Sequence, residues 1–456
     1  MPRPPRPRTF ARLGGILTNL SARRTVVCVH LRRFALAYSS AKQSPRLMQS
    51  ETSVRSKRNG HIRFLEHEYG SFRKEILDFF AQRLPSSAKA ILDPMAGTAP
   101  LIPFAYEKSI SAHFLDLLPL HYYVNAAKLY PAYLAFTRAE EKRRNYVARE
   151  AAHCLRSLRG KRLLVSSEDW LHPDALAGLL SAWRRADSYD LDMRSVIKAI
   201  LVLCIRPFSC YTASMSNHTW LKPGGVSTDL TPYAVAKRYA ESIKAFYATH
   251  YSSFEEAPRV EVTCSCGDCL DFRTRRRFDV ILTSPPYPNR FEPERMYGPE
   301  LRFFEEVGQP LDNSRLLATT RVSLYDGLED DRAFLRKVSP ATWAFIDQVR
   351  ETSNPGEADY YPKYFTRYYA GLYRRFLHLI RYLRPGGRMF VAVQDNVHRG
   401  HLNEMGRYIE DFLTRRGLTC SQPFEQMTRH YGLRNISVRH PLVLRKHREQ
   451  IIEASR

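Results

Sequence analysis

The chain lacks long hydrophobic runs and a cysteine framework. No apolar stretch in its 456 residues approaches the ~18–20 residues that a bilayer-spanning helix needs, so we expect no membrane segment. Five of its eight cysteines are scattered, which excludes the regular spacing of a disulfide scaffold and favours a reducing compartment. The scattered residues are Cys28, Cys154, Cys204, Cys210 and Cys420.

The other three cysteines form a short cluster, Cys264, Cys266 and Cys269, with CxCxxC spacing. No second Cys/His pair lies nearby at the spacing of a zinc site. The cluster also flanks Asp268, where the end of a strand is a sufficient explanation. We therefore predict no metal.

Acidic residues are absent from the first 50 positions, where arginine is frequent. Such a segment is typical of an organellar transit peptide or of a disordered basic arm that binds nucleic acid. It also fits an upstream extension of a chain that starts at Met48. We expect residues 1–60 to be a basic, disordered segment, and no function is assigned to it.

Positive charge is in large excess, at a net +24. An excess of this size favours a polyanionic partner, because Lys and Arg displace counterions from phosphates and attract the partner over distance. An anionic membrane surface is the alternative, but no basic amphipathic helix with a Trp/Leu face supports it. The length is enough for one elaborated domain or for two.

The most informative segment is residues 278–287, Phe-Asp-Val-Ile-Leu-Thr-Ser-Pro-Pro-Tyr. Its apolar run predicts a buried parallel strand, and the two prolines end the strand because neither has an N–H to donate. The stiff turn would aim Ser284, the Pro285 carbonyl and the Tyr287 ring at one point. Such a site can accept hydrogen bonds from an exocyclic amine while the ring stacks on the base. An ordinary strand-to-loop turn is the alternative.

Acidic residues end three other predicted strands. The strand that begins at Ala90 ends in Asp93 and a turn of small residues around Gly97, which lets a ligand approach the backbone next to a helix N-terminus that favours a carboxylate. About twenty residues later a strand ends in Asp116, a spacing that suits ribose hydroxyls in a nucleotide-binding βαβ unit. Asp268 follows a further strand, just before the Pro-Pro turn.

Together these segments resemble the S-adenosylmethionine-dependent amino-methyltransferases of DNA, which modify N4 of cytosine or N6 of adenine. Residues 92–98 match the glycine motif and residues 284–287 the catalytic motif. Ser284 is similar to the N4-cytosine subgroup, since the N6-adenine enzymes more often carry Asp or Asn there. Residues 96–100 depart from the family, reading Ala-Gly-Thr-Ala-Pro where a second glycine and threonines are usual.

The resemblance implies an α/β fold, a Rossmann-like class I methyltransferase sheet of seven mostly parallel strands with a largely helical insertion. The methyltransferase domain would comprise residues 61–130 and 258–446. Residues 131–257 would form the insertion, which is a candidate for target recognition. An antiparallel hairpin at the edge of the sheet is also expected from the family.

The resemblance also implies S-adenosyl-L-methionine as the cofactor and assigns its contacts. Asp93 would face the methionine amino group, Asp116 the ribose hydroxyls and Asp268 the adenine amino group. Each acid has the alternative role of a strand-end or helix N-cap residue. The further cofactor-binding residues would be Pro94, Ala96, Gly97, Thr98 and Tyr69, and the catalytic residues Ser284, Pro285, Pro286 and Tyr287.

The implied activity is site-specific methylation of a DNA base at an exocyclic amino group, as in restriction–modification systems. Ser284 favours N4 of cytosine as the target. The base must leave the duplex or be single-stranded to reach the site. An RNA amino-methyltransferase acting on tRNA and a non-catalytic nucleic-acid-binding relative are the alternatives. The expected location is cytoplasmic, at the nucleoid, with organellar targeting as the minor alternative.

Periodicity and turn residues predict the remaining elements and two candidate nucleic-acid contacts. One contact is the loop at residues 209–231 with Trp220, which would otherwise pack into the insertion. The other is the set Lys363, Arg367 and Arg374, beside an apolar helical stripe that we assign to the core. Predicted helices cover residues 71–84, 117–130, 139–158, 173–185, 194–204, 231–247 and 401–416, and late strands cover 388–393, 418–426 and 436–444.

Overall fold

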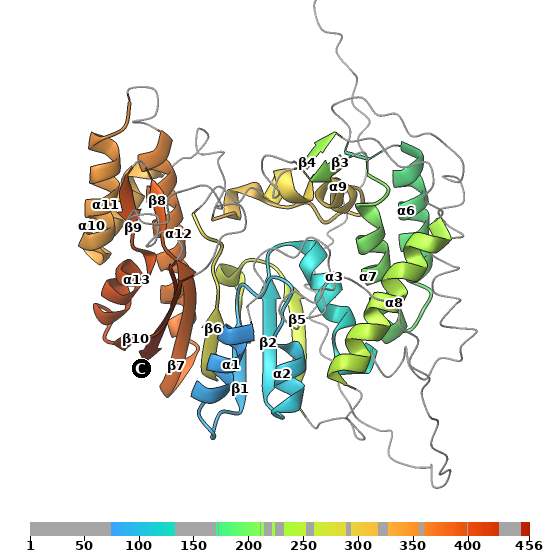
Figure 1. Cartoon of the computed structure of the whole chain (residues 1–456), viewed down its shortest axis with the longest axis horizontal. Helices are drawn as coiled ribbons and strands as arrows, with labels where there is room; N and C mark the ends of the chain where they lie inside the picture. Colours follow the sequence, from blue (N-terminus) through green and yellow to red (C-terminus); the bar gives the residue numbers. More distant parts are fainter. Residues whose placement is uncertain are drawn as a thin grey trace, which may run out of the picture. The chain divides into compact units, whose positions relative to one another are not determined.

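A seven-stranded sheet lies at the centre of the fold, in the order β10–β11–β7–β6–β1–β2–β5 (Figure 1). The computed structural model describes residues 74–132, 170–171, 173–209, 211–213, 221–223, 232–251, 260–288, 293–317, 327–354, 360–398, 400–427 and 448–456. The strands are β1 (Ala90–Asp93), β2 (Ser111–Asp116), β5 (Val262–Cys266), β6 (Phe278–Thr283), β7 (Leu383–Gln394), β10 (Thr419–Met427) and β11 (Arg448–Ser455).

The sheet is mostly parallel, with one antiparallel strand. β1 pairs in parallel with β2 and with β6, and β6 pairs in parallel with β7. β11 runs antiparallel to both of its neighbours, β7 and β10. The predicted α/β class with a mostly parallel sheet of seven strands is therefore confirmed, and the arrangement is compatible with a Rossmann-like fold.

Alternating side chains of the central strands contribute to two separate hydrophobic clusters, because successive residues of a strand point to opposite faces. Ile91 packs in one cluster with α1 (Lys74–Arg83), α2 (Ile102–Glu107) and α3 (Pro119–Ala127). Leu92, its neighbour, packs in the other with α12 (Tyr360–Ile380) and α13 (Met405–Thr414). Helices thus cover both faces, as a sheet of continuous apolar strands requires.

Three predicted helices of the insertion are confirmed: α6 (Pro173–Ala186), α7 (Leu191–Ile205) and α8 (Pro232–His250). The predicted helix at residues 139–158 lies outside the described residues. A short hairpin of β3 (Tyr211–Ala213) and β4 (Leu221–Pro223) falls between α7 and α8. α7 packs against α3 and α8, and the insertion helices share the hydrophobic cluster of β1 and α2, so this part of the insertion is continuous with the core.

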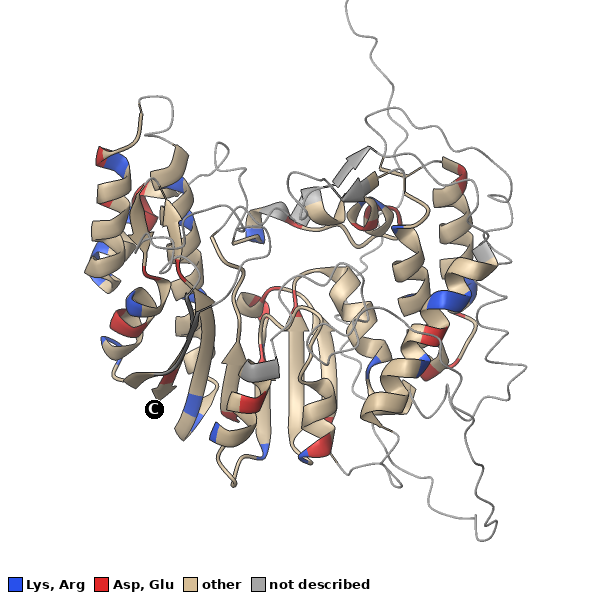
Figure 2. Cartoon of the chain, in the orientation of Figure 1, with Lys and Arg blue, Asp and Glu red and all other residues tan. Residues whose placement is uncertain are grey.

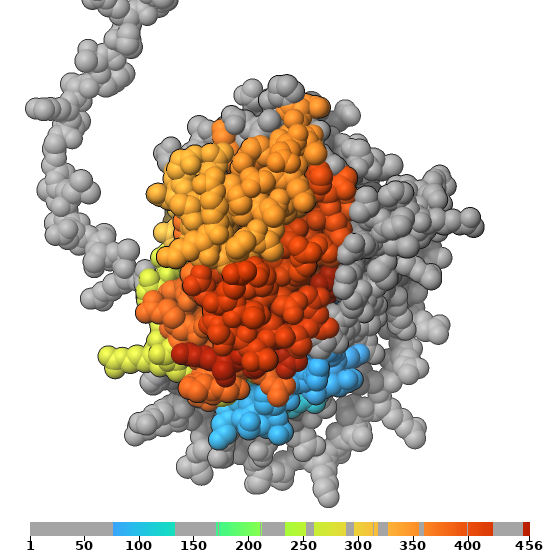
Figure 3. Space-filling view, turned by 90° about the vertical axis from the view of Figure 1, so that its left-hand side faces the viewer, coloured from blue at the N-terminus to red at the C-terminus, as the bar shows by residue number. Residues whose placement is uncertain are grey.

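The segment after the Pro-Pro turn supplies helices to both hydrophobic clusters. It contains α9 (Pro293–Glu306), the 3₁₀ turn η3 (Asn313–Arg315), α10 (Leu328–Val338), α11 (Pro340–Glu351) and α12. The apolar stripe that we assigned to the core is buried along α12, which confirms that assignment. Figure 3 shows the later part of the chain, from α10 onward and coloured orange to red, on one face of the molecule.

Three boundaries near the C-terminus differ from the prediction. β7 begins at Leu383 rather than at 388, because a shift in register after the Phe278–Leu383 pair accommodates the Pro-Gly-Gly turn. The start predicted for the last helix forms instead a small hairpin, β8 (Asn396–His398) and β9 (His401–Asn403), around Gly400 at φ 82°. The last strand is β11, and residues 436–444 lie outside the described residues.

Within the described ranges, no helix combines the length and the apolar character needed to cross a bilayer.

Truncating the core of α12 should destabilise the fold more than truncating a surface leucine. Leu372 is 0% exposed and Leu191 is 40% exposed. We expect Leu372→Ala to lower the free energy of unfolding by about 2–5 kcal/mol, because it removes buried methyl groups and leaves a cavity. Leu191→Ala should change it by less than about 0.5 kcal/mol. Equal shifts of the two denaturant midpoints would contradict the assignment of α12 to the core.

Candidate functional site

The predicted site residues lie where the central strands end. Asp93 is the last residue of β1 and pairs with Phe114 of β2, and Asp116 is the last residue of β2. Ser284 follows β6 directly, on the other side of β1. Figure 2 shows acidic residues, in red, in the loops at this edge. Open α/β sheets bind ligands outside the carboxyl ends of their strands, so the fold brings the two motifs together at such an edge.

Asp93 is a buried carboxyl group with an unused oxygen. The residue is 0% exposed, and its Oδ1 accepts a hydrogen bond of 3.3 Å from the Met95 N–H. Its Oδ2 is buried with no hydrogen-bond partner in the described part of the chain. Burial raises the pKa of Asp93 well above 3.8, and the Asp116 carboxylate raises this pKa further, against the opposing effect of the Met95 N–H. A cationic or amine group at Oδ2 would relieve this cost.

The loop between β1 and α2, residues 94–101, carries the glycine motif and is called the glycine loop below. It is tied to the end of β2. The Gly97 N–H donates to Asp116 Oδ2 at 2.7 Å. The other oxygen of Asp116 accepts from the Leu118 N–H and from His121 Nδ1, both at 2.9 Å. Asp116 therefore holds the loop by accepting these hydrogen bonds. Each carboxylate oxygen can accept more than one hydrogen bond, so a ribose hydroxyl can also donate to Asp116.

Two residues of this loop have left-handed backbone angles. Gly97 has φ 54° and Ala99 has φ 43°. Glycine adopts this region without steric penalty, whereas alanine is strained there. Ala99 lies among residues 96–100, the stretch that departs from the family pattern. Backbone strain of this kind concentrates at ligand sites, and here it lies in the loop that follows Asp93.

The helix after the loop offers little to a carboxylate. α2 is six residues long and has a proline in its first turn. The Ala99 and Ile102 N–H groups already donate to the carbonyls of Ala96 and Ala99. Pro94, Ala96 and Thr98 are buried in this loop, and they position its backbone. The N-terminus of α2 therefore gives little support to the carboxylate site that we expected there.

The Ser-Pro-Pro-Tyr turn is held in place by α12. The Ser284 and Tyr287 hydroxyls lie 3.2 Å apart, and both side chains are half-buried. The buried Tyr368 hydroxyl on α12 donates to the Pro286 carbonyl at 2.8 Å. Pro285 is buried beside them. The hydroxyls of Ser284 and Tyr287 thus lie together at the end of β6.

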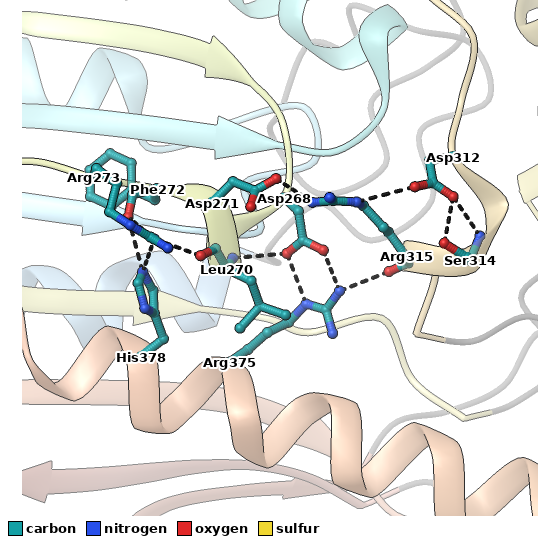
Figure 4. A network of polar contacts seen from close by, with 10 residues as sticks. All are labelled: Asp268, Leu270, Asp271, Phe272, Arg273, Asp312, Ser314, Arg315, Arg375 and His378. Atoms are coloured by element: carbon teal, nitrogen blue, oxygen red, sulfur yellow. Dashed lines mark hydrogen bonds and ion pairs between the residues drawn. The ribbon is translucent and has the colours of Figure 1, made fainter. Parts of the chain in front are cut away.

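Asp268 is engaged in an ion pair. It caps the 3₁₀ turn η2 (Cys269–Asp271), accepting from the Leu270 N–H at 2.9 Å. Arg375 of α12 binds both of its oxygens, at 3.2 and 2.6 Å. Figure 4 shows this pair together with Arg315, which contacts Asp271 and Asp312. An adenine amino group would have to share oxygens that already have partners, so the observed contacts of Asp268 are those of a strand-end residue.

The other predicted contacts have partners within the fold, are half-buried or lie outside the described residues. Arg367 is 9% exposed and donates to the Ser314 carbonyl at 2.8 Å, and Arg374 pairs with Asp331. Lys363 is half-buried. Tyr69 and Trp220 lie outside the described residues. The two arginines are thus committed to internal contacts rather than to a basic surface.

Sequence reasoning missed four buried polar residues that shape the site. Tyr368 fixes the Pro-Pro turn and Arg375 fixes Asp268. Asn125 and Lys128, at the end of α3, donate to the carbonyls of Gly97 and Thr98 at 2.8 and 2.5 Å. The available signal was a lysine and an asparagine on an otherwise apolar helix, since buried polar groups need partners.

The CxCxxC cysteines are not part of a metal cluster in the described ranges, where no group of three or more His, Cys, Asp or Glu residues is placed to hold an ion. Burial raises the thiol pKa of Cys264 and Cys269 to about 12 in each case.

Much of the positive charge lies outside the described residues. Residues 1–73 contain 15 Lys and Arg but three Asp and Glu, which accounts for half of the net +24. Figure 2 shows Lys and Arg at positions on several of the described helices.

No protein-family model matches this sequence, and no curated protein matches it either.

The raised pKa of Asp93 predicts a pH-dependent stability. Above about pH 4, an unfolded chain ionises this carboxyl freely, whereas the folded protein opposes ionisation, so stability falls as pH rises. Asp93→Asn removes the titration. We expect the melting temperature of the wild type to fall more steeply from pH 4 to pH 8 than that of the variant, and the variant to melt about 2 °C higher at pH 8.

Asp312→Asn is the matched control, because the Ser314 hydroxyl lowers the pKa of this exposed carboxyl. The melting temperature of Asp312→Asn should fall from pH 4 to pH 8 as steeply as that of the wild type, unlike that of Asp93→Asn. Parallel curves for the wild type and Asp93→Asn would contradict the account of Asp93.

Breaking the Asp268–Arg375 pair should be costly. The side chains are 3% and 8% exposed, so Arg375→Met leaves a buried carboxylate without its counter-ion, at about 3–5 kcal/mol. Adding Asp268→Asn should recover part of this loss. Arg302→Met, at an exposed ion pair on α9, should cost less than about 1 kcal/mol. Denaturant unfolding of the three variants and the wild type measures this, and equal losses for Arg375→Met and Arg302→Met would contradict it.

Proposed function

We propose that this protein is an S-adenosylmethionine-dependent methyltransferase that modifies an exocyclic amino group of a DNA base, N4 of cytosine. The observation that carries the proposal is the placement of two motifs on adjacent strands. The glycine loop with the buried Asp93 follows β1, and the Ser-Pro-Pro-Tyr turn follows β6, which pairs with β1. Cofactor and acceptor base would thus meet at one edge of the sheet.

The sheet supports the same family. An antiparallel strand, β11, stands among parallel strands near the edge, as the resemblance leads us to expect. The order of the elements also agrees, since the glycine motif precedes the catalytic motif along the chain. Fold alone does not decide function, so the proposal depends on the site residues.

The residues after β1 and β2 fit the amino-acid and ribose parts of the cofactor. Asp93 Oδ2 has no partner in the described residues, and the ammonium group of the methionine end would pair with it. Asp116 holds the loop through Gly97 and can accept a further hydrogen bond from a ribose hydroxyl. When bound, the cofactor supplies a methyl group on a positively charged sulfur.

The catalytic turn would act on the amine by accepting its hydrogens. The lone pair of an exocyclic amine is delocalised into the base, which makes the nitrogen a poor nucleophile. Ser284 Oγ and the Pro285 carbonyl would accept its two hydrogens and favour a pyramidal nitrogen. Tyr287 would stack on the base, and Tyr368 keeps the turn in position through the Pro286 carbonyl.

The acceptor would be nucleic acid. The net charge of +24 favours a polyanion, and a base in a duplex must flip out to reach a turn at the end of a strand, at a cost of about a few kcal/mol. Binding of phosphates offsets part of this cost.

The test is methyl transfer from labelled S-adenosylmethionine to unmethylated genomic DNA and, in parallel, to bulk tRNA, with the modified nucleosides separated by mass spectrometry. We expect N4-methylcytosine in DNA. Tyr287→Ala should lower the rate about 5- to 150-fold, because aromatic stacking on a base contributes roughly 1–3 kcal/mol. Tyr233→Ala, at an exposed tyrosine of α8, should leave the rate unchanged.

Each other outcome points to a different function. N6-methyladenine would keep the mechanism and reverse the inference from Ser284. Label in tRNA alone would make the protein an RNA amino-methyltransferase. Binding of S-adenosylmethionine without transfer to either substrate would favour a non-catalytic relative, and the absence of binding would overturn the proposal.

A further inference from the structure

Two buried side chains at the end of α3 hold the carbonyls of the glycine loop. Asn125 Nδ2 donates to the Gly97 carbonyl at 2.8 Å, and Lys128 Nζ donates to the Thr98 carbonyl at 2.5 Å. Asn125 is 2% exposed and Lys128 is 3% exposed. A buried ammonium is costly unless its surroundings compensate for the lost water, so the position of Lys128 under this loop calls for an explanation.

These contacts set the direction of the loop peptides. The C=O and N–H of a trans peptide point in opposite directions. Because Asn125 draws the Gly97 carbonyl toward α3, the N–H of Thr98 is turned away from that helix. The Gly97 N–H is separately fixed by Asp116. The loop is therefore held from both sides, with the Thr98 amide directed to its outer side.

Lys128 also brings positive charge to the loop. α2 is six residues long and has a proline in its first turn, so its N-terminus is a poor source of positive potential. The Lys128 ammonium contacts the loop through the Thr98 carbonyl, inside the protein, where charges interact more strongly than in water. A carboxylate bound at the loop would experience this charge.

The insertion keeps the end of α3 in place. The Tyr247 hydroxyl donates to the Ala127 carbonyl, and the Tyr251 hydroxyl donates to the Lys128 carbonyl at 2.5 Å. Both tyrosines belong to the segment of α8 and its last turn, and Phe246 of α8 lies 5.5 Å from the Lys128 ammonium. These contacts stop the end of α3 from moving away from the loop.

We propose that Asn125 and Lys128 are positioning residues for the carboxylate at the methionine end of the cofactor. Asn125 orients the Thr98 amide as a donor, and Lys128 provides the charge behind the loop. This inference rests on the proposed function. It concerns one end of the ligand, because Asp93 would serve the amino group, while Asn125 and Lys128 contact the loop through the Gly97 and Thr98 carbonyls.

The test compares two ligands that differ in the carboxylate, S-adenosylmethionine and decarboxylated S-adenosylmethionine. Both are titrated into the full chain by isothermal calorimetry. Lys128→Met should weaken binding of S-adenosylmethionine by about tenfold or more, as expected for a lost charge interaction in a buried site. It should weaken binding of the decarboxylated ligand by less than about threefold. Asn125→Leu should act in the same direction.

Lys198→Met is the matched control. Lys198 is also buried, at 8% exposed, and lies over the Trp183 ring at 4.3 Å on α7, where it pairs with Asp187. This variant should not change the preference between the two ligands. A loss of preference in both lysine variants, or an equal loss for both ligands in Lys128→Met, would overturn the positioning role.

Circular dichroism checks that each variant is folded. If Lys128→Met does not fold, Asn125→Leu decides the question, because it removes one hydrogen bond and leaves the buried charge in place. A wild-type protein that binds neither ligand overturns the proposed function itself, and with it this inference. A wild-type protein that binds both ligands equally overturns the carboxylate role while leaving the proposed function intact.

Discussion

The pairing of β1 with β2 on one side and with β6 on the other is the constraint on which the site depends. It places the loop after Asp93 between Asp116 and the turn at Ser284. The Gly97–Asp116 hydrogen bond then joins the ends of two strands. A slip of one residue in this pairing would turn Asp93 to the opposite face of the sheet, and the two motifs would no longer meet.

Three buried side-chain oxygens near this edge, on Asp93, Asn125 and Thr283, have no hydrogen-bond partner in the described residues. Each such atom costs stability. By contrast, the buried pair of Asp268 and Arg375 has partners for both carboxylate oxygens. Polar groups left without partners in a well-packed fold are typical of sites that complete their hydrogen bonds with a ligand, which agrees with the edge chosen for the cofactor.

Much of the fold could be predicted because its signals are local. Apolar runs identified the strands ending in Asp93, Asp116 and Thr283, and helical spacing identified the core stripe of α12. The start of β7 was missed because a register shift, which depends on the neighbouring strand, carries it through a Pro-Gly-Gly turn. The place of β11 was missed for a related reason, since its position between β7 and β10 is chosen by pairing with those strands rather than by its own periodicity.

The sequence by itself determined which residues end the central strands, and hence the candidate acids and the Ser-Pro-Pro-Tyr turn. Only the tertiary structure decided what those residues contact. Arg375 reaches Asp268 across 107 positions of chain and so turns a candidate adenine ligand into half of an ion pair. Lys128 and Asn125 reach the glycine loop from the end of the next helix. Hydrogen-bond partners depend on distance in space, and spacing along the chain does not encode that distance until the strands have paired.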